Sequence, residues 1–157
     1  MAAGKPPEIA AVIKADAPVG EASLSKLLIH VYDATLWSDT GGWSKAPYAL
    51  AIKYDMSFTA DELADRTYDE MKRVSDQPDA TLKQYADQLR TIFPNVKSGD
   101  RITALQQDAG TTLFYSNGKA IGKVSNPSFA QAFFGIWLSP KSSEPEMQQQ
   151  LTRVAKN

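Results

Sequence analysis

The sequence predicts an α+β domain in which a large, mostly antiparallel sheet has helices packed on one face. Three observations support this class. Residues 48–58, "YALAIKYDMSF", alternate large apolar with small or polar side chains, the period of a half-buried strand. Asn117-Gly118 lies between two apolar runs and predicts a β-hairpin. Several further stretches place apolar residues at helical spacing and end at prolines or polar loops.

A first strand is expected at residues 8–18, "EIAAVIKADAP", with Ile9, Ala11 and Ile13 on one side. A second, long strand is expected over residues 23–37, "SLSKLLIHVYDATLW". The glycine pair and the Ser, Asp and Pro content of residues 38–47 predict a loop before the strand at 48–58.

The helices follow from their start signals. Thr59 and Glu62 form a capping box, so a helix should begin at Thr59. A second helix should stop at Pro94, and a third should open with Asn126 as its cap and Pro127 as its first residue. A strand at 101–107 and the Asn-Gly hairpin lie between them. A last helix should turn three residues inward: Met147, Leu151 and Val154.

The chain has 157 residues, which suits one domain over 1–157 with a flexible lead at 1–7. Its net charge of -1 shows no basic excess for nucleic acid or an anionic membrane surface. No apolar run is long enough to span a membrane.

The chain contains no cysteine, which excludes disulfides, cysteine nucleophiles and thiolate metal sites. The opening "MAAGKPPEIA" lacks the apolar region of a signal peptide. Two locations stay open. The protein is periplasmic or secreted if the chain is a mature form without its signal peptide, and otherwise cytoplasmic. The polar, proline-containing lead slightly favours the first.

His30 is the single histidine, and Asp33 follows it three residues later. Side chains alternate along a strand, so residues three apart face opposite sides unless the segment is bulged or helical. We therefore expect a packed or rim-exposed His30 and no His30–Asp33 dyad. A carboxylate among apolar neighbours needs a partner or water, so Asp33 should cap a turn, pair with a Lys or Arg, or line a polar cavity.

No phosphate loop, dinucleotide fingerprint, calcium loop or serine nucleophile elbow occurs, and we expect no metal and no cofactor. Six Tyr, six Phe and three Trp exceed what a minimal core needs. Their regular spacing favours ordinary packing over the wall of an apolar cavity, and both interpretations stay open.

Six segments together resemble the bacterial branch of the chalcone isomerase-like superfamily, over about residues 20–152: "HVYDATLW", "APYALAIKYDMSF", "FPNVKSGDRIT", "LFYSNGKAIGKV", "NPSFAQAFFGIWLSP" and "SSEPEMQQQL". The resemblance implies an open-faced β-sandwich with a ligand cleft between sheet and helices. Plant chalcone isomerases and their fatty-acid-binding relatives carry an arginine shortly before the "VY" motif. Here that position is near Leu24, and the nearest cation is Lys26. The tyrosine and asparagine of the plant enzymes have no counterpart in "FTADELADRT".

The resemblance thus implies the fold without the ring-closing activity. The leading hypothesis is a non-catalytic protein that binds a small apolar or amphipathic molecule, fatty-acid-like or aromatic, in the cleft. Lys26 or Asp33 would supply polar contacts beside Leu24, and the lining would be Tyr32, Tyr48, Tyr54, Phe133 and Trp137.

Two alternatives stay open. One is an isomerase or lyase acting on an enone-like substrate, with Lys26, Tyr32 or His30 as the acid or base. The other is a structural or interaction module with an exposed apolar patch near residues 38–47, anchored by Trp43. The oligomeric state is not predicted.

Overall fold

A computed structural model describes residues 4–153 and confirms the predicted class. Six strands form one sheet in which every neighbouring pair is antiparallel and the spatial order follows the chain. The strands are β1 (Gly20–Lys26), β2 (Ile29–Ser38), β3 (Tyr48–Tyr54), β4 (Arg101–Asp108), β5 (Thr111–Ser116) and β6 (Lys119–Val124).

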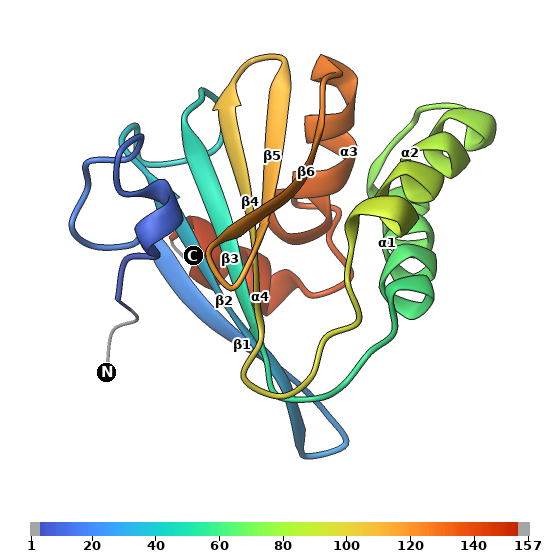
Figure 1. Cartoon of the computed structure of the whole chain (residues 1–157), viewed down its shortest axis with the longest axis horizontal. Helices are drawn as coiled ribbons and strands as arrows, with labels where there is room; N and C mark the ends of the chain where they lie inside the picture. The colour runs from blue at the N-terminus through green and yellow to red at the C-terminus, as the bar shows by residue number, and fades with distance from the viewer. Residues whose placement is uncertain (1–3, 154–157) are drawn as a thin grey trace.

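Four helices cover one face of this sheet (Figure 1). They are α1 (Ala60–Val74), α2 (Asp79–Ile92), α3 (Pro127–Leu138) and α4 (Pro145–Thr152). The main core fills the space between these helices and the sheet face that carries Leu36, Leu50 and Ala104. We call this face the helix side. Of the inward residues predicted for the last helix, Met147 and Leu151 are buried, and Val154 lies outside the described residues.

The opposite face of the sheet is covered by the segment before β1. Ile9 and Ile13 are fully buried there against Trp37, Ala49 and Leu105. The predicted strand at 8–18 is wrong: the segment contains a 3-10 helix, Pro7–Ile9, and Ala11 is exposed. Residues four apart lie on one side of a helical turn, so two buried isoleucines at this spacing match a strand and a helical turn equally well.

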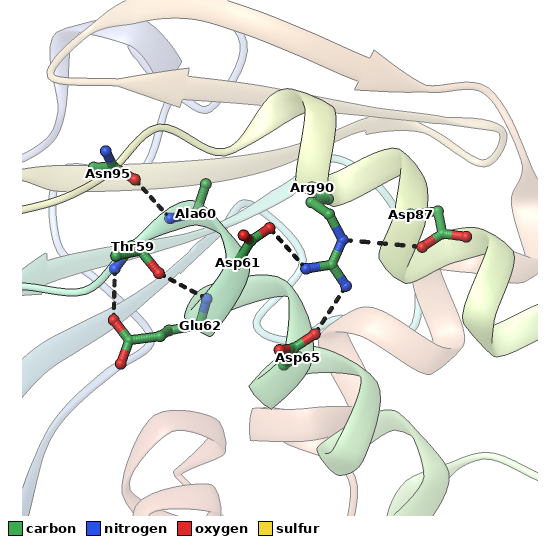
Figure 2. Close-up of polar contacts among 8 residues, drawn as sticks. All are labelled: Thr59, Ala60, Asp61, Glu62, Asp65, Asp87, Arg90 and Asn95. Atoms are coloured by element: carbon green, nitrogen blue, oxygen red, sulfur yellow. Dashed lines mark hydrogen bonds and ion pairs between the residues drawn. The ribbon is translucent and has the colours of Figure 1, made fainter.

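The start of α1 is as predicted (Figure 2). The Thr59 hydroxyl accepts from the Glu62 N–H at 3.0 Å, and the Glu62 carboxylate accepts from the Thr59 N–H at 2.9 Å. The Asn95 side chain accepts from the Ala60 N–H at 2.8 Å. Three of the backbone donors at this helix end are thereby satisfied, and the loop after α2 is attached to the start of α1.

A single arginine joins α1 to α2 (Figure 2). The Arg90 guanidinium lies 2.9 Å from Asp61 and 2.8 Å from Asp65, both on α1, and 4.0 Å from Asp87 on its own helix. These groups are exposed, so water competes for them and the cluster orients the two helices more than it stabilises them.

Residues 23–37 form a hairpin and not the single strand that was predicted. β1 ends at Lys26, and β2 begins at Ile29 directly opposite it. Leu27 and Leu28 make the two-residue turn with φ of 52° and 69°. Two positive φ angles define a type I′ turn, which normally uses Asn and Gly. Apolar leucines gave no turn signal, and this is why the break was missed.

The predicted hairpin at Asn117-Gly118 is confirmed, with φ of 50° and 87°. The two hairpins also share a bulge at the same place. Leu24 pairs with Tyr32 and Ser25 with His30, which leaves Val31 as an extra residue in β2. Phe114 pairs with Gly122 and Tyr115 with Ala120, which leaves Ile121 extra in β6.

Candidate functional site

The bulge at Val31 changes the outcome for His30 and Asp33. An extra residue advances the alternation by one step, so the two side chains share a face. His30 Nε2 lies 2.8 Å from Asp33 Oδ1, and His30 Nδ1 lies 3.0 Å from Asp55 Oδ2. The expectation that His30 and Asp33 do not meet is therefore wrong, because a bulge leaves no mark in the residue pattern.

The chemistry of this cluster is that of an ion pair. Both ring nitrogens can donate to carboxylates only in the imidazolium form. The hydrogen bonds with Asp55 and then Asp33 raise the pKa of His30 above 6.5. The nearby hydroxyls of Ser23 and Ser98 donate to Asp33 and Asp55, at 2.5 and 3.0 Å, and not to the imidazole. The arrangement fixes the base of the β1–β2 hairpin and activates no nucleophile.

The five aromatic candidates come together on the helix side. Tyr54 packs edge-on against Tyr32 with ring centroids 5.9 Å apart, and the Trp137 indole donates to the Tyr32 hydroxyl at 2.9 Å. Trp137 packs against Phe133 at 5.2 Å. Phe134 then lies between Phe133 at 5.3 Å and Tyr48 at 4.8 Å. The rings form one continuous row along the sheet–helix layer, and we call it the aromatic row.

The two ends of the aromatic row differ in burial. Tyr48 and Phe133 are buried, whereas Tyr32, Tyr54 and Trp137 are only partly buried. Tyr32 lies opposite Leu24 in β1 and Tyr54 in β3. This partly open end, which we call the Tyr32 end, is where the layer between sheet and helices meets the surface.

Two tyrosine hydroxyls offer polar contacts at the Tyr32 end. The Tyr32 hydroxyl accepts from Trp137 and donates to the Met147 sulfur at 3.8 Å, a weak acceptor. Burial raises the pKa of Tyr32 to about 12. The Tyr54 hydroxyl makes no hydrogen bond to any group within residues 4–153, and burial raises the pKa of Tyr54 as well. Both groups therefore stay protonated donors at neutral pH.

Charged side chains surround the Tyr32 end in pairs. Lys26 lies 3.1 Å from Glu144, the residue before α4. Arg66 on α1 lies 3.3 Å from Glu70, which also accepts from the Ser143 hydroxyl at 2.6 Å. The charges of Glu144, Arg66 and Glu70 all act on the Tyr32 hydroxyl. The rim thus holds two cations, each next to a carboxylate.

The remaining candidates divide between the two faces. Leu24 is partly buried against the main core beside Tyr32, and Lys26 stands on the same face. Asp33 faces the other way, because it pairs with Ser23 and follows Tyr32 without a bulge between them. Asp33 is therefore not part of a helix-side cleft. Its partners are His30 and Ser23, and not the Lys or Arg that was one of the expected roles.

Trp43, the proposed anchor of an exposed patch, is partly buried against the main core. It lines a surface hollow of about 390 Å³ between the end of α1 and α3. A second hollow, of about 260 Å³, lies on the outer side of α1 and α2 around Tyr68 and Arg90. Neither hollow is lined by the aromatic row.

The described part of the chain contains no group of three or more His, Asp or Glu side chains that could hold a metal ion. None of the helices within residues 4–153 is both long and apolar enough to cross a bilayer.

Comparisons with known proteins agree with this architecture. A curated protein of Haemophilus influenzae with no assigned function is 27% identical over 143 residues, which cover 89% of this chain and 69% of that protein. The crystal structure of an Arabidopsis thaliana fatty-acid binding protein superposes with a TM-score of 0.62 over 97% of both chains, at 10% identity. At that identity the likeness shows a shared fold. The sequence model of the family described as chalcone isomerase-like matches residues 22–152. The chain therefore belongs to the chalcone isomerase-like family.

Proposed function

We propose that this protein binds a small amphipathic molecule, fatty-acid-like or aromatic, at the Tyr32 end of the aromatic row, and that it does no chemistry on it. The observation that carries the proposal is the Tyr54 hydroxyl. Its ring packs edge-on against the Tyr32 ring in the sheet–helix layer, and the hydroxyl has no hydrogen-bond partner in the described residues.

No side-chain nitrogen or oxygen of the described residues is both buried and unpartnered, so the Tyr54 hydroxyl reaches the surface of the layer. It is therefore free to donate to a ligand with a carboxylate or carbonyl. Tyr32 can supply a second donor, because a ligand oxygen is a stronger hydrogen-bond acceptor than the Met147 sulfur to which the Tyr32 hydroxyl now donates. Lys26 and Arg66 at the rim would favour an anionic head group.

The apolar part of the ligand would lie along the aromatic row toward Phe133. Because these rings contact one another, the ligand must separate some of them on entry. Trp137 is partly exposed and hydrogen-bonded to Tyr32, so its fluorescence should change when the ligand separates the rings. The fold shared with a fatty-acid binding protein supports the choice of ligand class.

The proposal that the protein does no chemistry is supported by the groups around Tyr32. Leu24, opposite Tyr32, is apolar and cannot polarise a carbonyl. His30 lies on the other face of the sheet, bonded to two carboxylates. The isomerase or lyase alternative would use Tyr32, Lys26 or His30 as the acid or base. Tyr32 is partly buried on the helix side, and Lys26 is paired with Glu144 at the rim of the Tyr32 end. His30 lies on the opposite face of the sheet from both.

Two measurements test the proposal. Organic extracts of the purified protein are analysed by mass spectrometry for a bound amphipathic molecule. The ligand-free protein is then titrated with dodecanoate, and tryptophan fluorescence is the readout. The titrated protein carries W37F and W43F, so that Trp137 is its single tryptophan. Y54F should weaken binding about tenfold, the usual effect of one hydrogen bond to a charged group.

Y48F is the matched control. It also removes a tyrosine hydroxyl without a hydrogen bond in the described residues, six positions away in the same strand. Y48F should bind like the wild type if the head group lies at Tyr54. Equal binding by Y54F and the wild type, or an empty extract together with no fluorescence response, would contradict the proposal.

A further inference from the structure

The tip of the β1–β2 hairpin is exposed and apolar. Within residues 4–153 the large hydrophobic side chains with high exposure are Leu27 at 95%, Leu28 at 102%, Ile29 at 57% and Met56 at 37%. Three of them are consecutive: Leu27 and Leu28 form the turn, and Ile29 is the first residue of β2. Met56 follows Asp55, whose N–H donates to the Val31 carbonyl, so it lies beside the same hairpin. In Figure 1 this hairpin projects beyond the neighbouring loops.

The backbone of the tip makes these leucines more unusual. Both have positive φ, a region that costs free energy for any residue with a branched side chain and that Asn or Gly would occupy at little cost. No hydrophobic contact within the protein offsets this cost, because both side chains are almost completely exposed. An exposed apolar group held in a costly conformation indicates a surface that acts outside the chain.

We propose that the Leu27-Leu28 tip inserts into the surface of a lipid bilayer and docks the protein there. The size of the patch favours a bilayer over a protein. A stable interface between proteins buries about 800 Å² on each partner. Two leucines and part of an isoleucine on a narrow turn offer far less, whereas a bilayer needs no complementary surface and takes apolar side chains in proportion to their area.

The charges next to the tip support insertion driven by apolar side chains. Lys26 is paired with Glu144, and His30 is paired with Asp33 and Asp55. The tip therefore carries no unbalanced cationic group for anionic head groups, in agreement with the net charge of -1. Docking should depend little on salt and on lipid charge.

The geometry also fits a shallow insertion. Leu24 and Tyr32 lie three or four residues from the turn, about 10 Å along the strands. Apolar groups of interfacial proteins enter about 5–10 Å into the bilayer. With the leucines inserted, the Tyr32 end would stand at the level of the head groups. The docking proposal does not rest on the ligand proposed above.

The experiment measures co-flotation of the full chain with vesicles of phosphatidylcholine alone, and of an equal mixture with phosphatidylglycerol, at low and high salt. The wild type should float with both at either salt concentration. L27N/L28G, which supplies the preferred residues of a type I′ turn, should lower the partition coefficient roughly a hundredfold, because each leucine contributes about tenfold. L27M/L28M keeps the apolar tip and should float like the wild type.

Each other result overturns the proposal. A wild type that stays with the buffer contradicts it directly, as does flotation by L27N/L28G equal to that of the wild type. Flotation only with phosphatidylglycerol and only at low salt would show that the protein binds anionic head groups by electrostatic attraction and not by inserting its leucines. Concentration-dependent dimers in light scattering that L27N/L28G abolishes, without flotation, would show that a second copy occupies the tip. Circular dichroism of L27N/L28G distinguishes a loss of docking from unfolding, and we expect this variant to be folded and at least as stable as the wild type.

Discussion

The β1–β2 hairpin turns through Leu27 and Leu28, and the β5–β6 hairpin turns through Asn117 and Gly118. Both turns have two positive φ angles, and both hairpins have a one-residue bulge at the third position of the second strand. We call them the leucine hairpin and the asparagine hairpin. Their backbones follow one pattern, although their turn residues have opposite character.

Their surroundings differ as much as their residues. The Asn117 side chain accepts from the Arg101 N–H at 2.8 Å and donates to Asp100 at 3.1 Å. Gly118 lies close to Glu8 and Arg101, whose charged groups are 2.8 Å apart. The leucine turn contacts nothing of this kind and is exposed. Strand pairing holds the leucine turn without such contacts, and no contact within the described residues explains the choice of leucine there.

The largest expected effect comes from making the asparagine hairpin like the leucine hairpin. N117L/G118L places two branched side chains at positive φ and removes both hydrogen bonds of Asn117. We expect the free energy of unfolding to fall by about 3 kcal/mol. Urea denaturation monitored by circular dichroism measures it. A loss below a few tenths of a kcal/mol would show that the turn residues hardly matter.

The reverse exchange should have a smaller effect of opposite sign. L27N/L28G relieves the positive φ of two leucines and breaks no contact, so the free energy of unfolding should rise by about 1 kcal/mol. The same denaturation series measures the change, with L27M/L28M as the control that should leave stability unaltered. If L27N/L28G destabilises the protein, the leucines contribute to the fold, and the comparison between the hairpins fails.

The smallest expected effect is on the pH dependence of stability, which should differ between the ion pairs beside the two turns. His30 has a raised pKa, so its stabilisation is complete below 6.5 and is lost as the pH rises through the folded-state pKa. Burial alone would raise the pKa of Glu8, but hydrogen bonds from Arg101 and Thr103 bring it below 4.5. Its stabilisation is present above 4.5 and is lost as the pH falls.

Denaturation midpoints between about pH 3 and 9 should therefore show a small alkaline decline that H30Q removes, a few tenths of a kcal/mol for an exposed cluster. E8Q is the matched control: it should change the acid side and leave the alkaline decline intact. An H30Q curve parallel to that of the wild type would show that the pKa of His30 is the same in the folded and the unfolded protein.

The sequence was a good guide wherever a residue has a strong local preference. Asn117-Gly118 predicted its turn, and Thr59 with Glu62 predicted the start of α1. Leu27-Leu28 could not be recognised, because leucine disfavours the conformation it adopts there. Ile9 and Ile13 were correctly expected to be buried, but their spacing did not distinguish a strand from a helical turn.

The candidate site was predicted in part for similar reasons. Apolar alternation placed Tyr48 and Tyr54 on one face of their strand, and this face is the helix side, where both join the aromatic row. The contact of Trp137 with Tyr32 spans 105 positions and has no local signal. The contact of His30 with Asp33 depends on a bulge, and the position of Arg66 beside the Tyr32 end depends on helix packing. Neither can be predicted from residue spacing.

The bulges at Val31 and Ile121 also bear on how the length of this chain can vary among relatives. Without Val31, plain alternation from His30 to Tyr32 would leave both on the faces they occupy now, because Val31 has no partner residue in β1. A one-residue deletion there would preserve the turn and both layers. The same deletion at Ala34 would exchange the faces of everything between it and the turn. An alignment gap at Val31 or Ile121 is therefore compatible with an unchanged fold, and a gap elsewhere in these strands is not.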